Sequence, residues 1–176
     1  MKKNLLLLAA MICSLAVLTA CGDDKDEPQV KNVATCTYSV EFTPDVCDIN
    51  NGIIIYYKTA NNETKKDVLQ GNTTTSWNKS VELPIDSKNA IIGLRIEVVD
   101  KDVKDLAKDK YDLGIATQIS IKTTKGQTWG TGREEKFSTV KASQVKDWCS
   151  NYYSKFAKGF IISPNGTVDT YKPNFD

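Results

Sequence analysis

The most informative absence in the sequence is histidine, which does not occur among its 176 residues. Histidine is the commonest general acid or base in enzymes and the commonest protein ligand of zinc. A hydrolase built from this chain would have to rely on carboxylates such as Glu41, Glu82 and Glu97. We expect these three on separate polar strand faces, with nothing that would raise the pKa of one of them. The sequence therefore favours a protein without catalytic residues.

An excess of charge of one sign is also lacking. The chain has 23 Lys and Arg against 22 Asp and Glu, a formal net charge of +1. A nucleic-acid-binding protein would show a clustered basic face, so we expect no nucleic acid partner. The aspartates between Asp100 and Asp112 alternate with lysines, and they lack the Gly and the Glu that an EF-hand loop requires. We therefore expect neither a metal nor a cofactor.

The only long apolar run is short for a membrane span. It extends from Leu5 to Ala20 behind Met1-Lys2-Lys3, whereas about 20 apolar residues are needed to cross a bilayer. A basic start, an apolar middle and small residues at the end are the parts of a secretory signal. The run ends in Leu18-Thr19-Ala20-Cys21, which resembles the lipobox of bacterial lipoproteins. This resemblance implies that residues 1–20 are removed as a signal peptide and that Cys21 carries a lipid anchor in the membrane.

An acidic run follows Cys21 directly and consists of Asp23, Asp24, Asp26 and Glu27. It resembles the export signal of Bacteroidota surface lipoproteins, which implies a location on the outer face of the outer membrane; the periplasmic face is the alternative. A charged run of this kind is also typical of a solvated segment that does not fold alone. Both interpretations are compatible. We assign residues 21–33 to an acidic flexible tether.

The remaining chain, residues 34–176, shows the period-two alternation of β-strands. From Ala34 to Phe42, apolar residues occupy every second position, which indicates a half-buried strand. Further strands are expected over residues 53–57, 67–70, 76–83, 90–99, 115–121 and 127–137. Residues 44–52 are expected to form a turn, and residues 103–107 one or two helical turns. The pattern predicts one mainly β domain, an antiparallel β-sandwich of immunoglobulin-like architecture.

The C-terminal part has a different period. Apolar residues recur at helical spacing, which predicts an amphipathic helix packed on the sheet; they are Val145, Trp148, Cys149, Tyr152 and Phe156. Asn165-Gly166 then predicts the turn of a closing hairpin. The domain as a whole resembles a group of small Bacteroidota surface lipoproteins. The points of resemblance are the Thr- and Tyr-rich strands, the Lys110–Gly114 stretch and this helix. The resemblance implies a sandwich-like fold and no particular activity.

Three cysteines lie in the expected domain, and the cell envelope permits disulfides. If the first two strands form a hairpin, Cys36 and Cys47 are about 20 Å apart at 3.3 Å per residue, too far for a bond. A disulfide would therefore join Cys149 to Cys36 or to Cys47. The alternative is that all three are buried thiols that act as small hydrophobic residues.

Aromatic residues supply the only candidate ligand contacts. Flat rings exposed on a β-sandwich can stack on sugars. Trp129, between polar residues and close to glycines, is the first candidate and Tyr57 the second, whereas Trp77 and Trp148 fit the core by their spacing. The sequence favours a surface-anchored binding or adhesion module without catalytic activity, whose partners are the membrane and a glycan or protein ligand. The alternative is an accessory glycan-binding lipoprotein of an outer-membrane uptake system.

Overall fold

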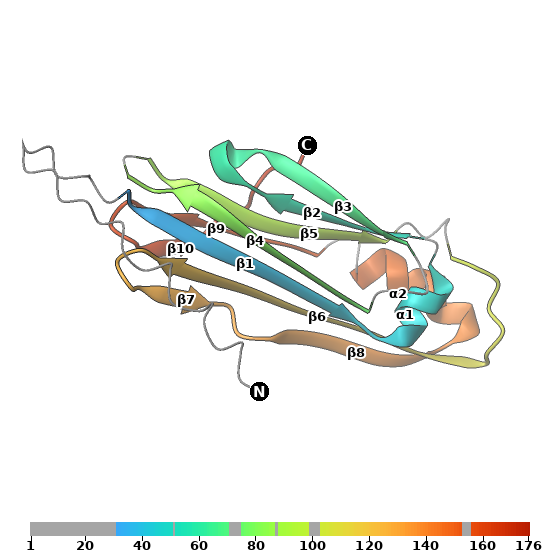
Figure 1. The fold of residues 1–176 in the computed structure, drawn as a ribbon. Helices are drawn as coiled ribbons and strands as arrows, with labels where there is room; N and C mark the ends of the chain where they lie inside the picture. Colours follow the sequence, from blue (N-terminus) through green and yellow to red (C-terminus); the bar gives the residue numbers. More distant parts are fainter. Residues whose placement is uncertain (1–30, 51, 71–74, 87, 99–102, 153–155) are drawn as a thin grey trace, which may run out of the picture. The chain divides into compact units, whose positions relative to one another are not determined.

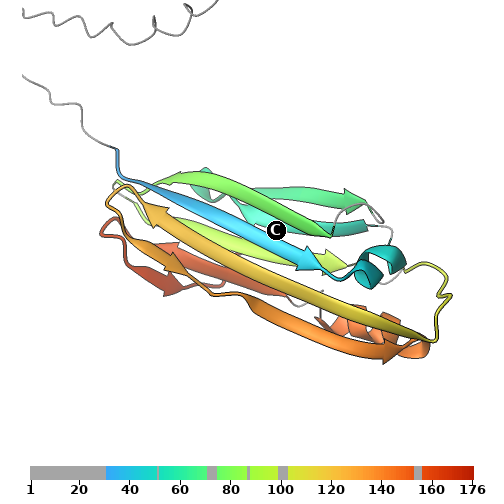
Figure 2. The same cartoon turned by 60° about the horizontal axis from the view of Figure 1, so that its bottom comes forward.

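A computed structural model describes residues 31–50, 52–70, 75–86, 88–98, 103–152 and 156–176 of the chain. Cys21, Asp23, Asp24, Asp26 and Glu27 lie outside the described residues, so the lipid anchor and the export signal remain predictions. The described residues form one compact unit from Lys31 to Asp176. Two sheets face each other in this unit and enclose its hydrophobic core (Figures 1 and 2).

The first sheet has five strands in the order β4-β1-β6-β7, and β8 also pairs with β6. Every pairing in it is antiparallel. Its strands are β1 (Val33–Phe42), β4 (Ser76–Pro84), β6 (Lys110–Thr123), β7 (Thr128–Gly130) and β8 (Glu134–Lys141). Since β6 is the longest strand, it accommodates β7 near one end and β8 near the other.

The second sheet also has five strands, in the order β10-β9-β5-β2-β3, and all of its pairings are antiparallel. Its strands are β2 (Gly52–Lys58), β3 (Thr64–Gln70), β5 (Ala90–Val98), β9 (Ala157–Ile162) and β10 (Val168–Thr170). The prediction of a mainly β, antiparallel sandwich is confirmed. Its immunoglobulin-like architecture stays a prediction.

Strand β1 shows why the alternating sequence gives this fold. Its inward residues Ala34, Cys36, Tyr38 and Val40 are fully buried. The Tyr38 hydroxyl crosses to the second sheet, where it donates to the Lys58 carbonyl at 3.0 Å and accepts from the Gly93 amide at 3.2 Å. This buried hydroxyl is thereby satisfied, and it joins β1 to both β2 and β5.

One short α-helix was not predicted from the sequence. α1 (Pro44–Ile49) occupies part of the segment that we expected to be a turn. Pro44 suits the first helical turn because it lacks an N–H that would go unpaired there. Asp45 favours the same turn through the helix dipole, and Val46 and Ile49 are buried in the core. A helix of this length has too few residues to show a periodicity.

The predicted C-terminal helix is confirmed as α2 (Val145–Tyr152), and its residues Val145, Trp148 and Cys149 are buried. It ends earlier than expected, since Phe156 follows the helix and its backbone carbonyl accepts a hydrogen bond from the Ile96 amide at 3.1 Å. α1 and α2 lie at the same end of the sandwich (Figure 1). Two single-turn 3-10 helices complete the described helices, η1 (Ala60–Asn62) and η3 (Ala142–Gln144). None of the helices described is both long and apolar enough to span a membrane.

The helical turns expected around Val103 to Ala107 do not form, and this prediction is wrong. Val103 instead makes an isolated antiparallel bridge with Asn50. The Lys104 amide donates to the Ile49 carbonyl at 2.6 Å. The backbone of this segment therefore satisfies its hydrogen bonds on the end of α1 rather than within a helix of its own.

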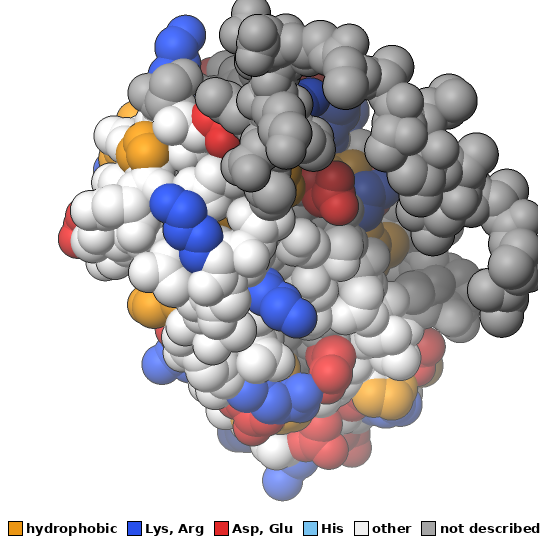
Figure 3. Space-filling view, turned by 60° about the vertical axis from the view of Figure 1, so that its left-hand side comes forward, with side chains coloured by type: hydrophobic (Ala, Val, Ile, Leu, Met, Phe, Trp, Pro, Cys, Tyr) orange, Lys and Arg blue, Asp and Glu red, His pale blue; other side chains and the backbone are white. Residues whose placement is uncertain are grey.

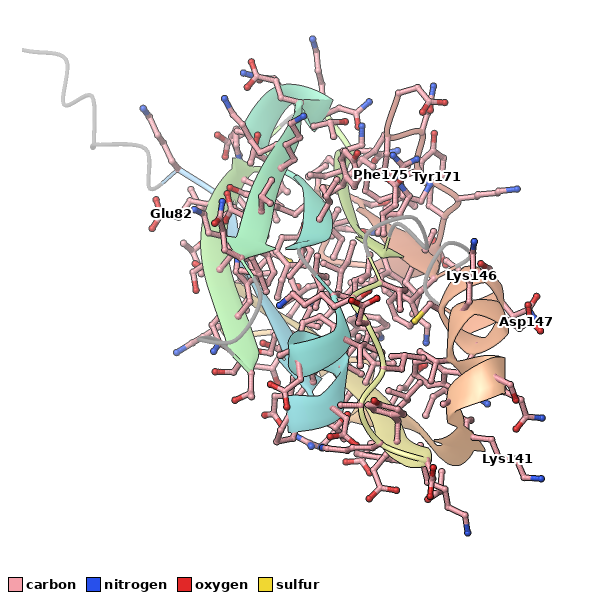
Figure 4. The ribbon with its side chains drawn as sticks, turned by 90° about the vertical axis from the view of Figure 1, so that its right-hand side faces the viewer. Glu82, Lys141, Lys146, Asp147, Tyr171 and Phe175 are labelled. Atoms are coloured by element: carbon pink, nitrogen blue, oxygen red, sulfur yellow. The ribbon has the colours of Figure 1, made fainter. Side chains whose placement is uncertain are left out.

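The two ends of the domain were predicted with unequal success. Asn32, assigned to the tether, belongs to the domain, since its amide donates to Asp86 at 2.5 Å and its side chain donates to the Pro164 carbonyl at 2.9 Å. The predicted closing hairpin is confirmed as β9–β10, with Gly166 at φ +87° in its turn. After β10 the chain crosses the outer face of the second sheet, where Phe175 is buried and Tyr171 is exposed (Figure 4).

Candidate functional site

Trp129 is not the exposed aromatic platform that the sequence suggested. It lies on β7 opposite Ile121, which is buried, so both side chains face the interior. The indole ring is partly buried against the core and meets the Phe160 ring edge-on, with centroids 4.4 Å apart. The expectation of an exposed ring is therefore wrong. Gly130 and Gly132 obscured the alternation that would have placed Trp129 inward.

Tyr57, the second candidate for ligand contact, is a core residue. It is only 4% exposed, and its ring lies 6.2 Å from Tyr38 and 5.4 Å from Trp77 between centroids. Its hydroxyl donates to Asp67 Oδ1 at 3.4 Å. A side chain in this position cannot reach a ligand without opening the sandwich, so this assignment is corrected.

The structure instead brings polar side chains together on the outer face of the first sheet. Across neighbouring strands, Thr35 is opposite Lys122, which is opposite Thr128; in the next outward row, Thr37 is opposite Ser120. Strands in a sheet lie about 4.8 Å apart, so these side chains form regular rows. The rows continue on β4, where Ser80 and Thr37 share a hydrogen bond of 2.9 Å between their hydroxyl oxygens.

These rows line a shallow hollow across β1, β6 and β7, with a volume of about 540 Å³. Its outward-facing lining is formed by small hydroxyl-bearing side chains, one lysine and a glycine; they are Thr35, Thr37, Ser120, Lys122, Thr128 and Gly130. Trp129 also lines it and so remains a candidate ligand contact, although its ring packs inward. We call this site the hydroxyl hollow.

The chemistry of the hydroxyl hollow is that of hydrogen bonding. Serine and threonine hydroxyls both donate and accept, and the Lys122 ammonium donates. Lys122 is the only charged side chain among the described residues that line it, and Glu82 stands on the other side of Thr35. In Figure 3, which brings the left-hand side of Figure 1 forward, much of the uncovered surface is neither hydrophobic nor charged, and it carries both basic and acidic side chains. Such a surface suits a ligand rich in hydroxyl groups.

The three carboxylates considered for hydrolysis are not brought together. Glu41 pairs with Arg133 at 2.6 Å on the first sheet, whereas Glu97 lies 3.9 Å from Arg95 on the second. Glu82 is opposite Thr35, six residues along β1 from Glu41, which is about 20 Å at the rise of a strand. The paired carboxyl groups of glycoside hydrolases are about 5–10 Å apart. Among the described residues, no group of three or more His, Cys, Asp or Glu side chains could hold a metal ion.

The cysteines do not form the predicted disulfide. Cys36, Cys47 and Cys149 are buried as thiols, none bonded to another, so the pairing of Cys149 with Cys36 or Cys47 is wrong and the alternative of buried thiols holds. Burial raises the pKa of Cys36 to about 12. Since the thiolate is the reactive form, Cys36 is a packing residue.

Comparison with known proteins returns no matching family model, no matching curated protein and no matching solved structure. The class of protein is therefore described by its structure alone. It is an antiparallel β-sandwich with a shallow polar hollow on one outer face. Of the residues that line this hollow, only Trp129 was expected from the sequence as a ligand contact. A signal existed, because Thr35 and Thr37 are the polar half of the alternation in β1, but only strand pairing shows that Ser120 and Thr128 join them.

Proposed function

We propose that this chain is a non-catalytic binding module, anchored by lipid at Cys21 on the surface of the cell envelope, and that its ligand occupies the hydroxyl hollow. The observation that carries the proposal is the hollow itself, about 540 Å³ in volume and lined by hydroxyls from three strands. This volume lies within the range of about 300–1,000 Å³ that is usual for ligand pockets. Adhesion to a surface that displays the ligand would be its role.

The lining favours a glycan as the ligand. A glycan presents many hydroxyl groups, and each can exchange hydrogen bonds with Ser120, Thr37 or Lys122. Among the described residues, the outward lining offers no aromatic ring on which a sugar could stack, because the Trp129 ring faces Phe160. Individual neutral hydrogen bonds contribute only about 0.5–1.5 kcal/mol net, so a useful affinity needs several sugar units along the rows. This supports the alternative role of an accessory glycan-binding lipoprotein in an uptake system.

The test is a glycan array probed with the purified protein and with the double variant Thr37→Val, Ser120→Ala. These substitutions remove two hydroxyls from the hydroxyl hollow and keep the strands. The matched control is Thr170→Val, an exposed threonine on β10 in the second sheet. We expect the control to bind like the parent and the double variant to lose binding. Equal binding by all three proteins, or no glycan bound by the parent, would contradict the glycan assignment.

A further inference from the structure

A second hollow lies between the two sheets, at the edge where β8 and β9 face each other. Its volume is about 320 Å³. Strand register places five of its lining residues on the inner faces of their strands; they are Ile115, Thr117, Glu134, Lys136 and Lys158. A sixth, Phe156, lies between α2 and β9. We call this site the edge cavity. It shares no lining residue with the hydroxyl hollow.

The opposite edge of the sandwich, between β3 and β4, is filled in a different way. There the rings of Tyr57 and Trp77 pack with centroids 5.4 Å apart. The Trp77 indole donates to Asp67 Oδ2 at 2.9 Å, and Lys79 lies 3.7 Å from the same carboxylate. At the β8–β9 edge, the inner face of β8 offers Glu134 and Lys136 instead of aromatic rings. The gap between the sheets therefore stays open at this edge.

The walls of the edge cavity divide into an apolar floor and a charged mouth. Ile115 is buried and Phe156 half-buried, and both contribute apolar surface. At the mouth, Lys158 donates a hydrogen bond to Glu134, and Lys136 is exposed. Lys158 lies on the inner face of β9 opposite Leu94, which is fully buried.

The charges at the mouth do not cancel. On the inner faces, two ammonium groups stand against the single carboxylate of Glu134. Glu135 also lines the cavity, but it lies on the other face of β8 and pairs with Arg133. Burial lowers the pKa of Lys158, and a second anion close to Lys158 would favour its charged form.

We propose that the edge cavity binds small amphipathic monocarboxylates. The apolar body of the ligand lies between the sheets against Ile115 and Phe156. Its carboxylate lies at the mouth, where Lys136 and Lys158 donate hydrogen bonds to it. Charge-assisted hydrogen bonds are about twice as strong as neutral ones, so the lysines select an anion over a neutral molecule of the same length.

The test uses octanoate as the probe and octanol as its neutral counterpart, measured by calorimetry on the purified protein. Amide shifts of Ile115 and Phe156 in NMR spectra locate the bound probe. Lys136→Gln removes one ammonium from the mouth, and Lys141→Gln removes one from the outer face of the same strand, away from the edge cavity (Figure 4). Both are exposed side chains, so both variants are expected to fold.

We expect octanoate to bind with one site per chain and to shift Ile115 and Phe156. Lys136→Gln weakens it about tenfold, octanol binds about tenfold more weakly than octanoate, and Lys141→Gln leaves binding unchanged. The proposal is overturned if millimolar octanoate shifts neither residue. It is equally overturned if both lysine variants weaken binding alike, or if octanol binds as tightly as octanoate. The hydroxyl hollow is unaffected by any of these outcomes.

Discussion

The three tryptophans all turn toward the interior of the sandwich, but to different depths. Trp77 and Trp148 are less than a tenth exposed, whereas Trp129 is only partly buried at the end of the first sheet's order. Periodicity predicted the first two because each lies in a regular strand or helix. It could not place Trp129, since β7 has only three residues and glycines adjoin it. A short element gives too few positions to show which side faces inward.

This difference in depth predicts a difference in stability. Trp148→Ala is expected to lower the free energy of unfolding by about 3–5 kcal/mol, as large aromatic truncations in a core do. Trp129→Ala is expected to cost about 1–2 kcal/mol, because part of its ring already contacts solvent. Urea unfolding followed by circular dichroism measures both. A larger loss for Trp129→Ala would show that the β7 end of the sandwich, and not α2, is the better packed region.

Asp45 predicts a pH dependence of stability. Burial acts to raise the pKa of this carboxyl, but the hydrogen bonds from Lys108 Nζ at 2.5 Å and from the Asp112 amide at 2.7 Å outweigh it, so the pKa lies below its usual value of 3.8. A folded-state pKa below the unfolded one stabilises the protein above the unfolded pKa, and this contribution is lost as the pH falls through the folded pKa.

Asp45→Asn should therefore cost about 1–3 kcal/mol at pH 7 and progressively less as the pH falls below 3.8. Urea unfolding at a series of pH values measures the difference between variant and parent. The matched control is Asp105→Asn, an exposed carboxylate in the loop before β6, which should change little at any pH. A cost that stays constant down to pH 2 would show that packing, and not ionisation, explains the role of Asp45.

Among elements, the regular strands and the Asn165-Gly166 turn could be predicted, whereas α1 and the segment after Val103 could not. The alternation in β1 and β5 is dictated by which side chains face the core, and the sequence carries that pattern in full. α1 and the extended segment after Val103 depend on each other, because Lys104 bonds to the last residue of α1 and Asn50 bridges to Val103. Contacts between segments about 50 residues apart leave no periodic trace in either. The hydroxyl hollow was missed for the same reason.

The segment after β10 illustrates how one element depends on a glycine in another. A Cβ on Gly159 would lie 2.3 Å from Pro173 Cδ and 2.9 Å from the Ile92 carbonyl oxygen. Gly159→Ala should therefore displace residues 171–176 from the second sheet and uncover Phe175, whose ring centroid now lies 5.6 Å from Lys58 Nζ. Hydrogen exchange of the last six residues measures the displacement.

Gly52→Ala is the control for this variant, because a Cβ there meets only ordinary contacts at 3.6 Å. It should leave the exchange of residues 171–176 unchanged. If Gly159→Ala also leaves that exchange unchanged, β9 itself shifts to accept the methyl group, and the close approach of Pro173 is not what holds the segment in place.

For the whole molecule, the proposed anchor gives a direct prediction. Cys21→Ala should abolish fatty-acid labelling and leave the protein unprocessed or released from the membrane fraction, because the thiol is the site of lipid attachment in the lipobox that residues 18–21 resemble. Labelling with a radioactive fatty acid, followed by fractionation, measures both effects. Full labelling and unchanged fractionation of the variant would contradict the assignment, with Cys13→Ala as the matched control.

The side of the membrane is a separate question for the whole molecule. If Asp23, Asp24, Asp26 and Glu27 direct surface display, their joint replacement by alanine should protect the domain from protease added to intact cells, while lipid labelling continues. Digestion of the variant at the same rate as the parent would leave the acidic run as a tether only. Digestion after lysis controls for access, since both proteins should then be cleaved alike.

The central position of β1 has a mechanical consequence. β1 begins at Val33, close to the amino-terminal end of the domain, and pairs with β4 on one side and β6 on the other, through nine residue pairs each. A pull on the amino-terminal end along the strand loads both ladders in shear, so their hydrogen bonds resist together instead of opening one after another from an edge. Thr35 and Thr37, which line the hydroxyl hollow, lie on this same strand. Traction from a ligand bound in the hydroxyl hollow would therefore pass to the amino-terminal end through β1 and the two ladders that hold it.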